Sequence, residues 1–234
     1  MRVTVVVPTY NEKENVSELV ARIAALAFAD LDIVIVDDRS PDGTAVAVRQ
    51  LMARFPFLHI IERSGKLGLG SAYVEGFKYA LKEGADIVCE MDADLSHAPE
   101  DLPRLIAAVT GGADVAIGSR RILGGKIVGW NWRRHFASKG AVWFSRMLLQ
   151  LRTKDATSGF RAYRTHVLRS IGFESVHSDG YAFQEEMLMR CERKGFIIKE
   201  IPTTFIDRTR GSSKLGYREI AAFFRSIFRL WMHQ

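Results

Sequence analysis

The sequence predicts an α/β fold in which a mostly parallel sheet carries helices on both faces. Short, apolar, β-branched segments alternate with helical segments over the first two-thirds of the chain, and this alternation is typical of βαβ units. The chain has 234 residues, of which 47% are hydrophobic and 26% are charged. It can therefore bury a sizeable core and is not expected to be disordered.

The expected elements follow one another in order along the chain. Strands are expected at 3–7, 32–36, 59–61, 87–91 and 115–118. The first helices are expected at 14–26, 44–54, 72–83 and 99–109. The last third is expected to hold a helix at about 131–151, a loop and strand at 155–163, a helix at 183–194, a strand at 196–201, a polar loop at 208–216 and a helix from 217 onward. We predict one domain over 1–215 and a C-terminal amphipathic helix over 216–234.

The net charge is +6, which fits a phosphate-bearing substrate, an anionic membrane or a nucleic acid. The chain shows no nucleic-acid-binding motif, and its basic residues group around one expected cleft, so a nucleic-acid partner is the least expected. Cys89 and Cys191 form no CxxC or Cys/His spacing, and we expect core thiols in a reducing compartment.

No apolar stretch of the sequence reaches the roughly 20 residues needed to span a bilayer. The apolar run that Pro8 ends lacks the charged start and long apolar middle of a signal peptide. The last helix carries aromatic and basic residues on different faces, which favours a membrane-interface location over a role only in the core. We expect a cytoplasmic protein, peripheral to a membrane; a further C-terminal membrane region or an anchoring subunit stays open.

Two carboxylates, Asp92 and Asp94, directly follow the fourth expected strand. Such a pair can hold a hard divalent cation against a diphosphate, because the cation prefers oxygen ligands and neutralises charge on the leaving group. Alternatively, Asp94 only caps a turn before the helix near Pro99. Ligands of open α/β sheets bind beyond the carboxyl ends of the strands, and this position favours the metal site.

The end of the first strand allows two interpretations. Asn11 and Glu14 can cap the first helix, or Tyr10 can lie against a nucleobase with Glu12 near the ribose or base edge. Both can hold together.

The end of the second strand carries Asp37 and Asp38 before a turn at 40–43. One of them is expected to bond a ribose or base edge, and the other to organise the turn. The glycine-rich segment 66–70 is not a GxxxxGK[ST] loop, which excludes that class of NTPase. Lys66 within it either approaches the donor or belongs to a simple turn.

The order of several segments resembles the inverting family 2 glycosyltransferases, and more closely the dolichol-phosphate mannose synthases and their prokaryotic polyprenyl-phosphate relatives. These segments are PTYNE (8–12), VDDRSPDGT (36–44), GLGSAY (68–73), MDADLSHAPEDLP (91–103), Gly118-Ser119-Arg120 and DATSGFRAYR (155–164). The resemblance covers roughly residues 3–214. It implies a GT-A fold, a nucleotide-diphosphate sugar donor, a polyprenyl phosphate acceptor and Mg²⁺ or Mn²⁺.

The resemblance, with the strand-end pattern, also implies site residues. The donor site is expected at Pro8, Tyr10, Glu12, Val36, Asp37, Asp38, Asp92, Ala93, Asp94, Arg120, Gln184, Arg208 and Lys214. The metal site is expected at Asp92, Asp94 and Ser96; Ser96 stands where the family often has glutamine, so the third ligand stays open. The acceptor phosphate is expected at Arg120, Arg133, Arg134, Ser138 and Lys139. The residues expected to carry the reaction are Asp94, Arg120, Arg134, Arg208 and Lys214.

The expected reaction is the inverting transfer of mannose from GDP-mannose to dolichyl or polyprenyl phosphate. A phosphate oxygen is already an anion at neutral pH, so the acceptor needs no strong general base. Two phosphate groups meet in this reaction, which requires several arginines and lysines nearby. The segment Gln184, Glu185 and Glu186 either orients sugar hydroxyls or belongs to the first turn of a helix, which favours acidic residues.

Other functions stay open from the sequence alone. The nearest is the same fold with UDP-glucose or another nucleotide sugar and the same acceptor class. A family 2 enzyme acting on a saccharide would need a well-placed catalytic carboxylate instead of two basic segments. A nucleotide-sugar-binding module without turnover would not need both the carboxylate pair and the full basic set.

Overall fold

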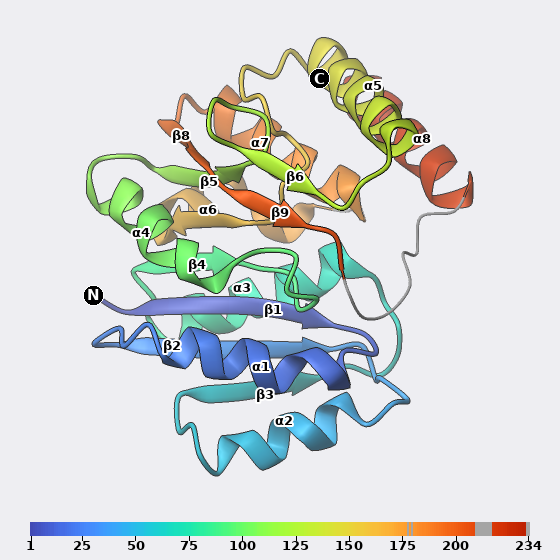
Figure 1. The fold of residues 1–234 in the computed structure, drawn as a ribbon. Helices are drawn as coiled ribbons and strands as arrows, with labels where there is room; N and C mark the ends of the chain where they lie inside the picture. Colours follow the sequence, from blue (N-terminus) through green and yellow to red (C-terminus); the bar gives the residue numbers. More distant parts are fainter. Residues whose placement is uncertain (177, 179, 209–216, 233–234) are drawn as a thin grey trace.

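The computed structural model describes residues 1–176, 178, 180–208 and 217–232 of the chain (Figure 1). Its main sheet has seven strands in the order β3-β2-β1-β4-β7-β5-β8. They are β1 (Val3–Thr9), β2 (Leu31–Asp37), β3 (Leu58–Glu62), β4 (Ile87–Glu90), β5 (Val115–Ser119), β7 (Arg161–Arg164) and β8 (Ile198–Pro202). Neighbouring strands run parallel except at β7, which is antiparallel to both β4 and β5. The expected α/β fold with a mostly parallel sheet is confirmed.

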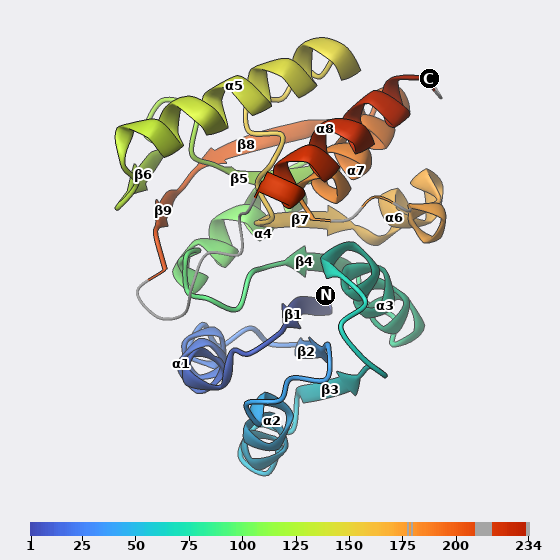
Figure 2. The ribbon, with the colours of Figure 1, turned by 90° about the vertical axis from the view of Figure 1, so that its right-hand side faces the viewer.

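Helices cover both faces of this sheet (Figures 1 and 2). One apolar cluster joins the sheet to α1 (Lys13–Ala24), α2 (Thr44–Met52) and α4 (Leu102–Thr110). The other joins it to α3 (Leu69–Lys82), α6 (Thr165–Ile171) and α7 (Tyr181–Arg193). Short 3₁₀ turns lie at η1 (Pro99–Asp101) and η2 (Phe173–Ser175). Strands buried on both faces explain why the sequence shows continuous apolar runs instead of alternation.

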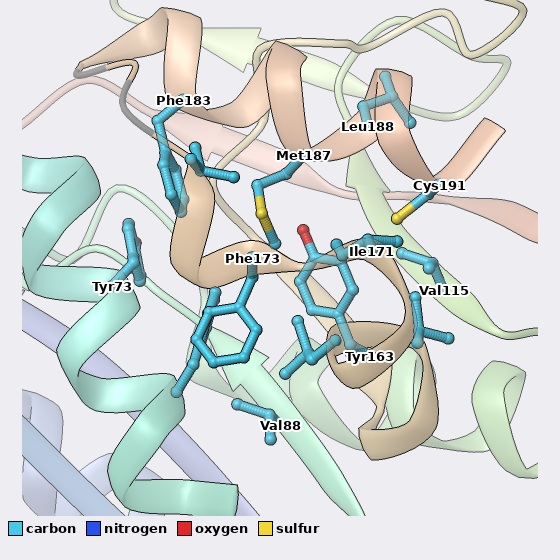
Figure 3. Close-up of a cluster of buried hydrophobic side chains, with 14 of the residues drawn as sticks. Tyr73, Val88, Val115, Tyr163, Ile171, Phe173, Phe183, Met187, Leu188 and Cys191 are labelled. Carbon is cyan, nitrogen blue, oxygen red and sulfur yellow. The ribbon is translucent and has the colours of Figure 1, made fainter. Parts of the chain in front are cut away.

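Aromatic side chains of α3 and α7 meet in the second cluster (Figure 3). Tyr73 of α3 stacks on Phe183 of α7 with ring centroids 5.6 Å apart, which joins two helices distant in sequence. Gly76 lets α3 approach β1 closely, because a Cβ atom there would lie 2.2 Å from Val6 Cγ1. Cys89 and Cys191 are free and buried, as expected.

Several expectations about local structure are corrected. Asn11 does not cap the first helix: its φ is 61°, and Glu12 occupies the N-cap position without a side-chain capping bond. The segment after Ala98 begins as a 3₁₀ turn before α4. The sequence reading missed α6 and the two-stranded sheet of β6 (Lys126–Val128) and β9 (Thr204–Ile206). Three-residue strands carry too short a pattern to be recognised.

The helices α5 (Trp132–Leu149) and α8 (Tyr217–Met232) lie side by side at the end of the molecule opposite β3 and α2 (Figures 1 and 2). Phe144 and Phe224 join them with ring centroids 5.2 Å apart, and Ile227 is fully buried. The proposed division of the chain near residue 215 stays a prediction. Across the described residues, no helix combines the length and apolar character needed to cross a membrane.

Candidate active site

The carboxyl ends of β1, β2 and β4 bring three predicted segments to one edge of the sheet. Thr9 pairs with Asp37 and Pro8 with Val36, while Val6 pairs with Glu90 on the other side of β1. The residues just beyond these strands therefore lie together. We call residues 8–12, 37–38 and 92–97 the strand-end edge.

The carboxylates of Asp92 and Asp94 lie at the centre of this edge. Asp94 is 9% exposed, accepts a hydrogen bond from Ser96 N at 3.0 Å and lies 3.1 Å from Arg208 Nη2. Asp92 Oδ1 accepts a hydrogen bond from the Tyr73 hydroxyl at 3.4 Å. Desolvation, then the charge of Asp94, raises the pKa of Asp92 to about 7. Since 36% of the Asp92 side chain is exposed, solvent screens part of this effect.

The surroundings of the carboxylate pair fit a divalent cation. Ser96 Oγ is buried without a hydrogen-bond partner in the described part of the chain, and so is His97 Nδ1, which lies 3.8 Å from Asp92 Oδ2. Desolvation and the charge of Arg120 lower the pKa of His97 to about 4, so its ring is neutral. Within the described ranges, no three His, Cys, Asp or Glu side chains converge as a metal cluster. Two carboxylates suit an ion such as Mg²⁺, which completes its shell with water and substrate phosphates.

The two aspartates that follow β2 have different partners. Asp37 organises the turn, because it accepts bonds from Thr9 Oγ1 at 2.9 Å and from Ser40 N at 2.8 Å. Asp38 accepts a bond from Arg63 Nη1 at 2.6 Å, and its other oxygen accepts bonds from the backbone of residues 67 and 68. Arg63, which sequence reasoning missed, thus ties the glycine-rich loop to the strand end. The expected contact of one of these aspartates with the donor stays a prediction.

The same loop places Lys66 above Tyr10, with Lys66 Nζ 4.5 Å from the ring centroid. Of the two interpretations of Lys66, this favours an approach to the predicted donor site. The predicted nucleobase residue thus has a positive charge over one face of its ring.

Arg120 is held at the end of β5 by a buried carboxylate. Its Nε donates to Asp155 Oδ2 at 2.8 Å and its Nη2 to Oδ1 at 2.7 Å. Burial opposes ionisation of Asp155, but the hydrogen bonds and charge of Arg120 outweigh it, so the pKa of this carboxyl lies below its ordinary value. Such a two-point pair fixes the orientation of the guanidinium plane.

Arg134 begins α5 and contacts the end of β9. It lies 2.6 Å from Asp207 Oδ2 and 4.3 Å from the centroid of the Trp130 ring. The predicted acceptor residues divide on α5: Arg134 and Ser138 are partly buried, whereas Arg133 and Lys139 are exposed. Arg121, which was not predicted, donates to Ser138 Oγ at 2.7 Å. Its place next to Arg120 was the signal that could have found it.

The β6–β9 region joins these cations to the carboxylate pair; we use this name for residues 126–138 and 204–208. Ile206 N donates to Ser96 O at 3.1 Å, and Asp207 N donates to Val128 O at 2.9 Å. Asp207 and Arg208 follow β9 directly, so Asp207 reaches Arg134 while Arg208 reaches Asp94. Lys214, predicted with Arg208, lies outside the described residues.

The three predicted residues of α7 have different surroundings. Gln184 is 3% exposed, and its buried amide lies close enough to Glu90 to act on that carboxyl. A Cβ at Gly159 would lie 3.5 Å from Gln184 Nε2 and 3.6 Å from Asp92 Oδ1, so Gln184 lies near the pair. Glu185 accepts a bond from Ser145, and Glu186 pairs with Arg190. Both lie beyond the first helical turn, which corrects that interpretation.

Comparisons with known proteins identify the family of this chain. Residues 4–172 match the family described as glycosyl transferase family 2. The chain is 46% identical over 216 residues to the polyprenol monophosphomannose synthase of Mycolicibacterium smegmatis, covering 92% of this chain and 81% of that protein. It is 44% identical over 216 residues to the undecaprenyl-phosphate mannosyltransferase of Micrococcus luteus, covering 92% and 88%.

A solved structure shares the fold. The mannosyltransferase from Pyrobaculum calidifontis in complex with GDP-Man and Mn²⁺ superposes with a TM-score of 0.64 at 22% identity, over 97% of this chain and 64% of that one. The chain therefore belongs to glycosyl transferase family 2 and is a glycosyltransferase with the GT-A fold.

Proposed function

We propose that this glycosyltransferase transfers mannose from GDP-mannose to a polyprenyl or dolichyl phosphate with inversion at the anomeric carbon. The observation that carries the proposal is the end of β9, where Arg208 contacts Asp94 while the adjacent Asp207 holds Arg134. These contacts link two groups. One is a carboxylate pair suited to a metal ion bound to a diphosphate, and the other is a guanidinium suited to a second phosphate. The names of relatives at 44% and 46% identity support the same donor sugar and acceptor class.

On the donor side, Asp92 and Asp94, with Ser96 nearby, would hold Mg²⁺ or Mn²⁺. The bound ion supplies charge neutralisation for the departing nucleotide diphosphate. Arg208, already at Asp94, adds a cation beside the same leaving group, and we assign Lys214 the same role. Tyr10, with Lys66 over its ring, would contact the base, and Gln184 would orient the sugar hydroxyls.

On the acceptor side, Arg120 and Arg134 would bind the lipid phosphate and direct its oxygen toward the anomeric carbon. Each guanidinium is pre-oriented, Arg120 by Asp155 and Arg134 by Asp207, which lowers the cost of ordering the acceptor. The attacking oxygen needs no proton removed, so the reaction requires no general base. This agrees with Glu185 and Glu186 being engaged by Ser145 and Arg190.

We also propose that α5 and α8 rest on a membrane surface, at the cytoplasmic face. Large apolar side chains are exposed on both helices, among them Trp132 at 69% and Phe136 at 73% on α5, and Phe228 and Trp231 on α8. The exposed side of α5 also carries Arg133 and Lys139. Aromatic and basic side chains together are typical of helices at a lipid interface, and this location brings the lipid phosphate to Arg134.

The direct test is transfer of radiolabelled mannose from GDP-mannose to dolichyl phosphate in detergent, with Mg²⁺ or Mn²⁺ and with EDTA. We expect label in the lipid phase that depends on the metal. Label only from UDP-glucose would overturn the sugar assignment and retain the acceptor class. Donor binding with no transfer from any nucleotide sugar would contradict the proposed reaction.

A further inference from the structure

Arg208 occupies an oxygen that the metal would use. Its Nη2 lies 3.1 Å from Asp94 Oδ2, while Asp94 Oδ1 accepts the bond from Ser96 N. A divalent cation held by Asp92 and Asp94 would need lone pairs on these carboxylate oxygens. The guanidinium and a bare cation therefore compete for Asp94, and their charges repel at short range.

Backbone hydrogen bonds hold the chain on the N-terminal side of Arg208. Phe205 forms a backbone bridge with His97, and Ile206 N donates to Ser96 O at 3.1 Å. Arg208 N donates to Asp207 Oδ1 at 3.1 Å, and Asp207 in turn holds Arg134. The guanidinium can therefore move from a carboxylate to a nearby phosphate without displacing β9.

We propose that Arg208 acts as a counter-ion that disfavours a bare divalent cation at Asp94, so that the site accepts the cation together with a nucleotide diphosphate. A diphosphate offers the guanidinium a second, more highly charged partner, and arginine binds phosphate oxygens through two N–H groups. A bound diphosphate would draw Arg208 off Asp94 and leave that carboxylate able to hold the metal. The inference rests on the proposed function and concerns the order in which its ligands bind.

The test measures Mn²⁺ binding, by calorimetry or by the electron paramagnetic resonance signal of free Mn²⁺, with and without GDP. For Mn²⁺ alone, we expect Arg208→Gln to bind about threefold more tightly than wild type, or better, since the competitor is gone. With GDP present, we expect Arg208→Gln to bind Mn²⁺ less tightly than wild type, because the variant has lost a side chain that binds the diphosphate. Arg208→Lys keeps the charge and should remain near wild type without GDP.

Arg104→Gln is the matched control. It removes the same charge from another Arg–Asp pair, between Arg104 and Asp101, and should leave both affinities unchanged. Equal or weaker binding of Mn²⁺ alone to Arg208→Gln would overturn the proposal, as would binding undetectable in both proteins.

Asp94→Asn separates this inference from the function on which it rests. Loss of Mn²⁺ binding in this variant supports the metal site, and retained binding would contradict it. Tighter Mn²⁺ binding to Arg208→Gln without any mannose transfer by the wild type would support the competition while overturning the proposed reaction.

Discussion

At the strand-end edge, charged side chains meet because parallel strands of one sheet end together; in the β6–β9 region, they meet because ion pairs connect distant parts of the chain. Asp37 accepts bonds from Thr9 of the neighbouring strand and from Ser40 in the turn that follows, and Asp38 accepts a bond from Arg63, just beyond β3. Arg134 depends on Asp207, 73 residues away. The first arrangement follows from strand register, whereas the second needs the whole fold. We therefore expect variants at the strand-end edge to impair use of the donor, and variants in the β6–β9 region to impair binding of the lipid phosphate.

Asp94→Asn should have the largest effect and should disturb only the donor half. Loss of one carboxylate from the metal pair is expected to lower kcat/KM for mannose transfer about a thousandfold. Binding of lipid phosphate, measured separately in detergent, should be unchanged. Asp101→Asn is the control, and near-normal turnover by Asp94→Asn would contradict the metal assignment.

Arg134→Gln should disturb the acceptor half instead. The loss of a charged phosphate ligand is expected to raise KM for the lipid phosphate about tenfold or more, with KM for GDP-mannose unchanged. Arg133→Gln provides the comparison, because Arg133 is exposed on the same helix and should change this KM less. An equal rise in KM for the lipid phosphate in both variants would contradict a specific role of Arg134 in binding the acceptor.

The double variant Phe136→Ser/Trp143→Ser tests the exposed face of α5. Both side chains are exposed, so their loss should weaken binding to anionic vesicles about tenfold while leaving thermal stability unchanged. Val46→Ser, an exposed apolar position on α2, serves as the control in a vesicle-sedimentation assay. Unchanged vesicle binding would argue against this face as the membrane contact.

Glu185→Gln should have the smallest effect on mannose transfer, because its consequence is expected in the pH dependence of stability. Burial raises the pKa of Glu185 from 4.5 to about 8, so between these values the folded state holds a proton that the unfolded chain has released. The free energy of unfolding should therefore fall as pH rises through this window, by at most about 1.4 kcal/mol per pH unit from this group.

The side chain of the Glu185→Gln variant does not ionise, so the contribution of Glu185 to the change of unfolding free energy with pH should disappear. The free energy of unfolding is measured by urea titration at several pH values. Glu174→Gln, at an exposed position, should unfold with the wild-type slope. Parallel slopes for wild type and Glu185→Gln would mean that Glu185 is ionised in the folded protein.

The sequence by itself determined the α/β fold and the identity of the strand-end segments. Continuous β-branched runs alternating with amphipathic helices specify buried parallel strands, and residues just past such strands must share one edge. For this reason Asp92 and Asp94 could be predicted as a pair, and the order of the motifs sufficed to indicate the family.

Only the tertiary structure decided which charged groups meet across the chain. It paired β6 with β9, directed Arg208 to Asp94 and Arg121 to Ser138, and assigned Asp38 to Arg63. Three-residue strands have no readable period, and an ion pair between distant residues leaves no local pattern in the sequence. These contacts exist because folding brings separate segments together, so only the tertiary structure shows them.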